Sequence, residues 1–288
     1  MTAPPLQYFG GKTRLARDIV ATFPPHVHYV EPYAGSLAVL LEKSPSVMET
    51  VNDLDGDLMC FWRVLRDRPA ELARVCALTP HSRAEHLEAF DRPDTLDDLE
   101  RARRTWAYIV QGRAGVLRNT GWRHFVAPGG SSTGMPGYLR GYVDRMAPAA
   151  ERLARVSLEC RSALDLIERY GRSPEVLLYV DPPYLGSSRV WGNNYRHEMR
   201  TDVEHRELAA ALADCKASVV VSGYPSPLYD ELYDGWHTSR FDATTGQGGV
   251  RGERVEVLWS NRPPQLDLFS DHDTPAPSGG TAQPGGAQ

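Results

Sequence analysis

The stretch VLLYVDPPY, residues 176–184, decides the fold. Its first five residues, Val176–Val180, are apolar throughout, as expected of a strand covered on both faces at the centre of a parallel sheet. Asp181–Tyr184 follows this strand directly. Ligands of open α/β sheets bind just past the carboxyl ends of the strands, so this turn is expected to line a binding site.

The first sixty residues predict a second part of the same sheet. Strand, turn, helix and strand are expected at residues 27–31, 32–35, 36–43 and 47–51. Ser36 is the candidate N-cap of the helix, and the second strand ends at Asn52 and Asp53. This order implies two parallel strands joined by a right-handed crossover.

The alternation of strands and helices resumes after residue 155. We expect strands at 156–160, 176–180 and 217–222, helices at 163–170 and 201–213, and a terminal antiparallel hairpin of 236–241 and 254–260. Thr201 with Glu204 three residues later has the form of a capping box, which marks a helix start. The fold class is therefore α/β.

The region between these two parts has a different pattern. Helical periodicity dominates from about residue 59 to 155, apart from a Gly-rich, irregular part between Gly112 and Gly141. We therefore divide the chain into an α/β domain formed by residues 1–58 and 156–262, a mostly helical insertion at 59–155, and a tail at 263–288. The Pro, Gly, Ser, Thr and Gln content of the tail is typical of disorder.

Charge is unevenly distributed along the chain, whose net charge is -5 over 288 residues. Ten arginines lie between Arg101 and Arg155, opposed only by Asp144 and Glu151, so this segment carries a charge of +8. Such a segment in an acidic protein is a candidate surface for phosphate groups. An arginine-rich solvated helix face is an equally good interpretation of the composition.

Other classes of protein fit the sequence poorly. The four cysteines lie far apart without a C-x-x-C pair, which argues against a disulfide framework or a zinc site. The histidine spacings also lack the pattern of metal ligands, so no metal is expected. The chain has no apolar signal segment at its start and no run of membrane-spanning length, and we expect a cytoplasmic protein that does not bind membranes.

The Asp181–Tyr184 turn has the groups needed to act on a conjugated amine. The lone pair of such an amine is delocalised into its ring, which makes the nitrogen a poor nucleophile. The Asp181 carboxylate and the Pro182 carbonyl would accept its two hydrogens and favour a pyramidal nitrogen. Tyr184 would supply a face on which a base stacks. The alternative is an ordinary proline-rich turn after a strand.

Two further segments predict a cofactor pocket. Gly35 lies in the turn between the first strand and its helix, where a glycine lets a ligand approach the backbone. Asp53 follows it by 18 residues at the end of the next strand, the position of a ribose ligand. Asp53 could also be the N-cap of the helix that follows. Near the N-terminus, Gly10 and Gly11 before Lys12 suggest close approach of the backbone to an anion.

These segments together resemble the Dam-like family of N6-adenine DNA methyltransferases over residues 6–262. The N-terminal YFGGK (8–12), the first-strand EPYAG (31–35), Asn52-Asp53 and the full Asp181–Tyr184 motif carry the resemblance. Their order, with the insertion before the catalytic motif, resembles the alpha group. YRHEM (195–199) and RVEVLWSN (254–261) resemble phage-borne members in particular.

The resemblance implies a Rossmann-like fold that uses S-adenosylmethionine, with the insertion at 59–155 as a target-recognition domain. It implies methyl transfer to the N6 amine of adenine in double-stranded DNA after the base is flipped out. The implied catalytic residues are Asp181, Pro182 and Tyr184. The implied cofactor-binding residues are Tyr8, Lys12, Glu31, Gly35, Asp53 and Asp181. The implied DNA-binding residues are Arg113, Arg118, Asn119 and Arg123.

The chain departs from the family pattern at three places. Leu37 stands where the first turn often has a second glycine, and Ser162 stands where many members carry an aspartate after a strand. The family's arginine-asparagine segment is matched only at Arg118 and Asn119, so the recognition sequence stays open. A cytosine-N4 methyltransferase and a catalytically silent DNA-binding module are the alternatives. A restriction endonuclease partner, a role in phage self-protection and a solitary role are all compatible with the sequence, and the oligomeric state is open.

Overall fold

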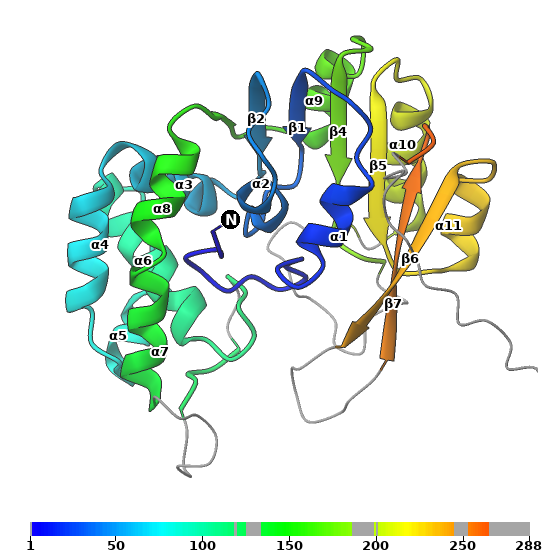
Figure 1. Ribbon diagram of the computed structural model, residues 1–288. Coiled ribbons are helices and arrows are strands. Elements are labelled where there is room, and N and C mark those ends of the chain that lie inside the picture. The colour runs from blue at the N-terminus through cyan, green and yellow to red at the C-terminus, as the bar shows by residue number, and fades with distance from the viewer. Residues whose placement is uncertain are drawn as a thin grey trace, which may run out of the picture.

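The computed structural model describes residues 2–117, 120–124, 134–185, 199, 201–244 and 253–264. Its centre is a seven-stranded sheet in the order β3-β2-β1-β4-β5-β7-β6 (Figure 1). The strands are β1 (His28–Glu31), β2 (Met48–Asn52), β3 (Ser157–Glu159), β4 (Val176–Val180), β5 (Ser218–Gly223), β6 (His237–Thr244) and β7 (Glu253–Ser260).

Strands β1 to β5 are parallel, and the hairpin of β6 and β7 adds two antiparallel strands. The chain runs from β1 outward to β2 and β3, and then returns to β4 on the other side of β1. Strand order therefore reverses between β1 and β4, and such a switch point opens a crevice at the carboxyl ends of the strands. This crevice is where Asp181 follows β4.

Side chains of the central strands alternate between two apolar cores. Leu177 and Tyr179 of β4 belong to the core on one face, while Val176, Leu178 and Val180 belong to the core on the other. All five are buried, which confirms the predicted central strand. Burial on both faces contributes about 1.5–3 kcal/mol for each large apolar side chain, and this fixes the position of the turn that follows.

Helices cover the sheet and extend it to one side. Those that follow or precede strands directly are α1 (Ala16–Ala21), α2 (Ala38–Glu42), α3 (Gly56–Asp67), α9 (Ala163–Tyr170), α10 (Asp202–Ala213) and α11 (Pro227–Leu232). Those of the insertion are α4 (Pro69–Leu78), α5 (Arg83–Glu88), α6 (Asp98–Gln111), α7 (Gly134–Val143) and α8 (Met146–Leu153). Figure 1 shows α4–α8 gathered to the left of the sheet, with the N-terminal segment between the two parts.

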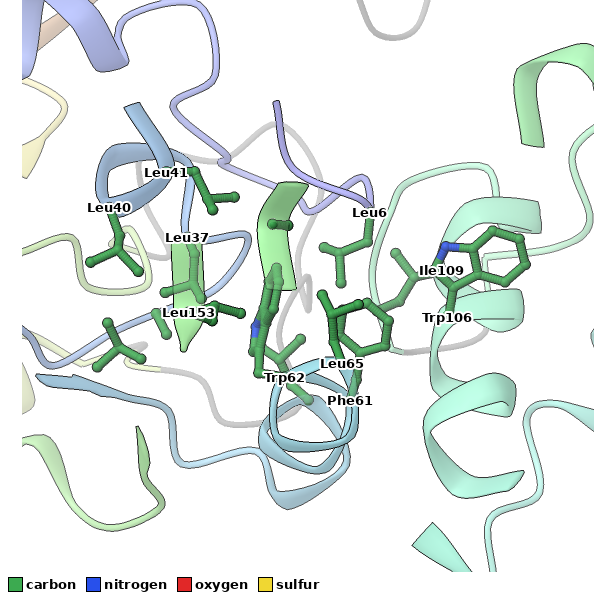
Figure 2. Close-up of a cluster of buried hydrophobic side chains, with 14 of the residues drawn as sticks. Leu6, Leu37, Leu40, Leu41, Phe61, Trp62, Leu65, Trp106, Ile109 and Leu153 are labelled. Carbon is green, nitrogen blue, oxygen red and sulfur yellow. The ribbon is translucent and has the colours of Figure 1, made fainter. Parts of the chain in front are cut away.

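The helical insertion shares one core with the sheet. Figure 2 shows Phe61, Trp62 and Leu65 of α3 packed between Trp106 on α6 and Leu37 beside α2. The sequence boundary drawn at residue 58 therefore falls inside α3, a helix that contributes to both parts. The division at 58/59 and 155/156 stays a prediction.

Most predicted elements agree with the structure, including the capping box of Thr201 and Glu204 at α10. Two expectations were wrong. Ser36 does not cap α2, because Leu37 occupies the N-cap position in a left-handed conformation without a side-chain hydrogen bond. The part between Gly112 and Gly141 is not irregular throughout, since α7 begins at Gly134. Burial of Met135 and Leu139 outweighs the low helix propensity of its glycines. The residues from 265 onward lie outside the described part.

Candidate functional site

A cavity of about 320 Å³ lies at the carboxyl ends of β1, β2 and β4. Its walls include residues 8–12, 31–36, 52–55 and 162–164, together with Asp181 and Pro183. The predicted first turn, acidic strand end, N-terminal segment and DPPY turn thus meet in one place. Asn52 links these loops, because its amide donates to the Pro32 carbonyl at 2.9 Å and to the Arg161 carbonyl at 3.0 Å.

Gly35 occupies a position that only glycine fits well. Its φ is +47°, in the left-handed region, and a Cβ there would lie 3.2 Å from the Tyr8 ring. Its N–H donates to Asp53 Oδ2 at 3.0 Å, and its carbonyl accepts from Trp62 Nε1 at 3.1 Å. The backbone of the turn is therefore fixed at the wall of the cavity.

Asp53 is held at the cavity wall and does not cap a helix. Its Oδ1 accepts the Asp55 N–H at 3.0 Å while Oδ2 accepts from Gly35. The N-cap of α3 is Asp55, whose side chain accepts the N–H groups of Asp57 and Leu58. The sequence left two roles open for Asp53, a ribose ligand and a helix N-cap. The second is excluded, because Asp55 fills the capping position.

Two of the three departures from the family pattern lie in segments that form the cavity wall, although Leu37 itself does not line it. Leu37 is fully buried with φ 55° and ψ 27°, so the turn keeps the left-handed geometry that a glycine would adopt freely. A side chain in this conformation costs about 1–2 kcal/mol. Ser162 lines the cavity and caps α9, with its Oγ accepting the Leu164 N–H at 3.3 Å.

The paired glycines before Lys12 allow close packing of the N-terminal segment on the first turn. Gly10 has φ +75°, and a Cβ on Gly11 would lie 3.0 Å from both Ser36 Oγ and the Tyr8 carbonyl. This packing directs Lys12 into the interior, where it is 5% exposed. There its ammonium pairs with the chain's own Asp181, while the approach of the glycine backbone to an anion stays a prediction.

Lys12 and Asp181 form a buried ion pair at the end of β4. The Lys12 ammonium donates to Asp181 Oδ1 at 2.7 Å and Oδ2 at 2.8 Å, and to the Gly10 carbonyl at 3.1 Å. It also donates to the Tyr184 hydroxyl and lies 4.9 Å from the centroid of the Tyr184 ring. Asp181 keeps 19% of its side chain exposed, on the cavity side of the pair.

Burial and the opposite charge of the partner shift the pKa values of Lys12 and Asp181 in opposite directions. Burial lowers the pKa of Lys12, but Asp181 and Glu256 outweigh it and leave that pKa well above its ordinary value. Burial raises the pKa of Asp181 to about 6, against the opposing effect of Lys12. Lys12 is therefore an ammonium, and Asp181 is ionised at neutral pH.

Three residues that the sequence did not single out as functional lie behind this pair. Glu256 on β7 is 3% exposed, and its Oε1 lies 3.5 Å from the Lys12 ammonium. Ser222 Oγ donates to the same Oε1 at 2.6 Å. Tyr224 stacks on Tyr184, with ring centroids 4.3 Å apart. The signal for Glu256 was an acidic residue between Val255 and Val257 of β7, which only the fold connects to Lys12.

Glu31 at the end of β1 is a second buried carboxyl group on the cavity wall. It is 3% exposed and accepts a hydrogen bond from the Tyr29 hydroxyl at 2.9 Å. Burial raises the pKa of Glu31 to about 8, and the hydrogen bond from Tyr29 only partly offsets this. At neutral pH Glu31 is therefore mostly protonated in the protein alone.

Comparison with known proteins identifies the chain. The model of the D12 class N6 adenine-specific DNA methyltransferase family matches residues 8–245, which contain every segment described above except β7. The chain belongs to this family. It transfers a methyl group from S-adenosylmethionine to the N6 amine of adenine in DNA, and its fold is the Rossmann-like methyltransferase fold.

A relative and two solved structures are similar to this methyltransferase. The Type II methyltransferase M1.LlaDCHI of Lactococcus lactis subsp. cremoris is 25% identical over 276 residues, covering 90% of this chain and 95% of that protein. A precorrin 8W decarboxylase from Methanobacterium thermoautotrophicum has a TM-score of 0.38 and 10% identity, covering 90% of this chain and 98% of that one. A SAM-dependent methyltransferase from Agrobacterium tumefaciens has a TM-score of 0.37 and 12% identity, covering 87% and 61%.

The methyltransferase carries a short hairpin-like loop beside the cavity. Gly112 and Trp122 form an antiparallel bridge, and Arg123 N–H donates to the Gln111 carbonyl at 2.7 Å. The loop contacts the N-terminal segment, where the Phe9 N–H donates to the Gly115 carbonyl at 2.9 Å. This contact brings Gly115 of the insertion next to the wall formed by residues 8–12.

The predicted DNA-binding residues all belong to this loop. Arg113 is exposed, and its Nε donates to the Trp122 carbonyl at 3.2 Å. Arg123 donates to the Tyr138 hydroxyl at 2.6 Å and to Gln7 Oε1 at 2.8 Å, so it is partly engaged within the protein. Arg118 and Asn119 lie outside the described residues.

Four of the ten arginines counted in the basic segment are paired with acidic residues from outside it. Arg101, Arg103 and Arg104 of α6 bind carboxylates of α3 and α5 and of neighbouring turns, and each is only about 15% exposed. Arg152 on α8 binds Glu49. The charge that this segment can offer to phosphates is therefore smaller than the +8 counted within residues 101–155.

Neither a metal site nor a membrane-spanning helix is found among the described residues. No group of three or more His, Cys, Asp or Glu side chains within the described ranges could hold a metal ion. None of the described helices combines the length and the apolar character needed to cross a bilayer.

Proposed function

We propose that Asp181, Pro182 and Tyr184 form the catalytic centre of this methyltransferase, and that its substrate is adenine flipped out of double-stranded DNA. The observation that carries this proposal is the position of Asp181. It stands at the carboxyl end of the central strand, is held by Lys12 and lines the cavity. An amine inside a duplex cannot reach such a recessed carboxylate, so the base must leave the stack.

The cavity fits the methyl donor. Its volume of about 320 Å³ is within the range of small-molecule sites. Gly35 offers a stretch of backbone without a side chain, and the Asp53 carboxylate is fixed by two N–H donors. We assign Asp53 to ribose hydroxyls, and Tyr8 and Lys12 to the neighbouring wall. S-adenosylmethionine carries its methyl group on a sulfonium, so no enzyme nucleophile is required.

Glu31 is suited to the positively charged amino group of that molecule. Its carboxyl group lines the cavity and is buried without a basic partner among the hydrogen bonds and ion pairs of the described residues. A carboxyl group in this setting is neutral until a cation approaches and favours its ionised form. We therefore assign Glu31 to the cofactor's ammonium.

Asp181 and the Pro182 carbonyl activate the adenine amine by accepting its hydrogens. The Asp181 carboxylate is ionised at neutral pH, and a charged acceptor forms the stronger hydrogen bond. Proline has no N–H donor, so the turn presents acceptors only. The rate gain comes from holding the amine in line with the methyl group and from the fixed negative charge.

DNA binds across the insertion in this proposal, with residues 59–155 as the target-recognition part and 1–58 and 156–262 as the catalytic part. The loop at 112–124 carries the exposed Arg113 and contacts the N-terminal wall of the cavity. Arginine contacts to phosphates supply salt-dependent affinity beside the flipped base. Arg118, Asn119 and Arg123 complete the proposed DNA-binding set.

The biological setting is proposed from the relative M1.LlaDCHI, which is named a Type II methyltransferase. We propose that this chain works in the cytoplasm beside a restriction endonuclease whose site it protects. Expression in a host without DNA methylation, followed by methylation-aware sequencing, would give the modified base and its context. DNA from the same cells should resist cleavage by the partner endonuclease.

The test of the catalytic assignment is Asp181→Ala, with Glu168→Ala as the matched control. Glu168 is an acidic residue on α9 that is 74% exposed and paired only with Arg172. Asp181→Ala should reduce methyl transfer by at least a thousandfold and leave DNA binding largely unchanged, whereas the control should remain fully active. Activity retained in Asp181→Ala would refute the assignment.

A further inference from the structure

Met199 lines the cavity assigned to the cofactor and is held there at two points. The Tyr33 hydroxyl, from the turn after β1, donates to Met199 Sδ at 3.5 Å. His205 Nε2 lies 3.1 Å from the Met199 carbonyl oxygen. Tyr33 precedes Met199 by 166 positions, so the fold alone brings the two side chains together. Met199 is the last residue of the YRHEM stretch, whose residues 195–198 lie outside the described part.

His205 is a buried residue of α10 whose ring is held on both sides. It is 1% exposed and is not among the residues that line the cavity. A carbonyl oxygen only accepts, so Nε2 carries the proton and donates to Met199. In the neutral ring Nδ1 then accepts from the hydroxyl of Tyr229, a buried residue of α11, at 3.0 Å. His205 therefore acts on the cavity through the backbone of Met199.

The part of the wall formed by Met199 differs in chemistry from its surroundings. Acidic side chains line much of the cavity, among them Glu31 and Asp181. Tyr33 and Met199 instead pack on the apolar core that contains Leu208, which also lines the cavity. A thioether is flexible and polarisable, and it makes favourable contacts with aromatic rings. This part of the wall is therefore suited to an uncharged, aromatic portion of a ligand.

The turn that carries Tyr33 is bonded to the end of β2, where Asp53 stands. The Gly35 N–H donates to Asp53 Oδ2 at 3.0 Å. Burial raises the pKa of the Tyr33 hydroxyl, and the charges of Asp53 and Glu204 contribute to the increase, as expected of carboxylates close to it. Asp53 is assigned to the ribose of the cofactor. Tyr33 and Met199 therefore lie on the side of the cavity that receives the nucleoside half.

We propose that Met199 contacts the nucleoside half of S-adenosylmethionine, and that Tyr33 and His205 are positioning residues that hold Met199 against it. The inference rests on the proposed assignment of the cavity to the cofactor. A contact with the nucleoside is remote from the transferred methyl group, so it is equally strong before and during methyl transfer. Its loss should raise the KM for the cofactor and leave kcat unchanged.

Calorimetry on the full-length enzyme tests the contact with two ligands. S-adenosylmethionine has both halves, whereas methylthioadenosine has the nucleoside without the amino acid. Met199→Ala should raise the Kd of both ligands about tenfold, because it removes an apolar side chain from the ligand's surface. The control Val203→Ala removes an apolar side chain that is 62% exposed on α10 and should change neither Kd. Unchanged affinity in Met199→Ala, or a loss for S-adenosylmethionine alone, would overturn the proposed contact.

A double-mutant cycle tests whether the Tyr33 hydroxyl acts through Met199. Tyr33→Phe should raise the Kd for S-adenosylmethionine about threefold in the wild-type background. It should have no effect in Met199→Leu, which keeps the apolar volume but removes the sulfur acceptor. An equal effect in both backgrounds would mean that the hydroxyl acts on the ligand directly, and it would overturn the positioning role of Tyr33.

Two substitutions of His205 test the hold on the Met199 backbone. Asparagine reaches only the position of Nδ1, so His205→Asn leaves the Met199 carbonyl without this donor, whereas the amide of His205→Gln reaches the position of Nε2. We expect the KM for S-adenosylmethionine to rise about fivefold in His205→Asn at unchanged kcat, and to return to within about twofold of wild type in His205→Gln. Equal losses in both variants would overturn the positioning role of His205. If His205→Asn does not fold, the cycle of Tyr33 and Met199 carries the test.

Asp53→Ala separates this inference from the proposed function. If the cavity holds the cofactor, Asp53→Ala should itself raise the Kd of both ligands. Wild-type affinity in Asp53→Ala would refute the assignment of the cavity. A weakened Asp53→Ala beside a normal Met199→Ala would refute only the role of Met199.

Discussion

Replacing Glu31 by glutamine should stabilise the protein in the absence of cofactor, and more so at higher pH. Burial raises the pKa of Glu31 from 4.5 to about 8. Below pH 4.5 the group is protonated in both the folded and the unfolded chain, so its ionisation does not change the free energy of unfolding. Between pH 4.5 and 8 the unfolded chain loses a proton that the folded protein keeps, and stability falls as pH rises.

The expected magnitude follows from this difference in pKa. Each pKa unit corresponds to about 1.4 kcal/mol, so Glu31 costs about 1 kcal/mol at pH 5 and about 4 kcal/mol at pH 8. Glutamine has nearly the same shape and still accepts from the Tyr29 hydroxyl, which donates to Glu31 at 2.9 Å. The gain in unfolding free energy of Glu31→Gln should therefore be about 3 kcal/mol larger at pH 8 than at pH 5.

Urea unfolding of the cofactor-free protein at the two pH values measures this gain. Glu175→Gln serves as the control, because this glutamate is exposed and its substitution should change stability equally at both values. Glu31→Gln should also weaken binding of S-adenosylmethionine and abolish the proton release that accompanies binding near pH 7. An equal effect of Glu31→Gln at pH 5 and pH 8 would refute the assignment of a neutral buried carboxyl group.

Two further predictions concern the insertion. Arg113→Ala should weaken DNA binding at low salt and reduce the slope of log K against log salt by about 0.9, the value for one phosphate contact. The control Arg172→Ala alters an arginine that is 74% exposed just after α9, and it should leave the slope unchanged. Arg152→Met should destabilise the fold by about 3 kcal/mol, because it removes one ion-pair partner of the buried Glu49 and leaves it with Lys43 and the Ser46 N–H. Burial raises the pKa of Glu49, but Arg152 and Lys43 outweigh this effect and lower that pKa. The loss of unfolding free energy in Arg152→Met should therefore be at its full value above pH 4.5. It should disappear as pH falls through the lowered pKa of Glu49. A salt slope unchanged in Arg113→Ala, or a loss in Arg152→Met that persists in acid, would contradict these expectations.

The sequence predicted the parts of the fold that local patterns determine. Val176–Val180 was identifiable because a strand covered on both faces is apolar at every position, and α10 because Thr201 and Glu204 complete a capping box. The family resemblance supplied the DPPY motif and its chemistry. These signals lie within a few residues of one another, so no tertiary contact is needed to find them.

The remaining features depend on contacts between distant parts of the chain. The Lys12–Asp181 pair joins residues 169 positions apart, and Glu256 reaches the pair only because β7 lies beside β5. Ser36 carried a local capping signal that the left-handed Leu37 overrode. The charge of +8 within the arginine-rich segment exceeds its unpaired charge, because four of its arginines pair with carboxylates outside it, such as Glu49.

The left-handed Leu37 also bears on how relatives of this enzyme are found. Leu37 keeps the backbone turn of a glycine while its side chain fills the core between α2 and α3 (Figure 2). A search pattern that demands two glycines in the first turn would reject this chain although its cofactor cradle is intact. Homologues that lack the second glycine are better sought by an apolar residue two positions after the glycine that corresponds to Gly35.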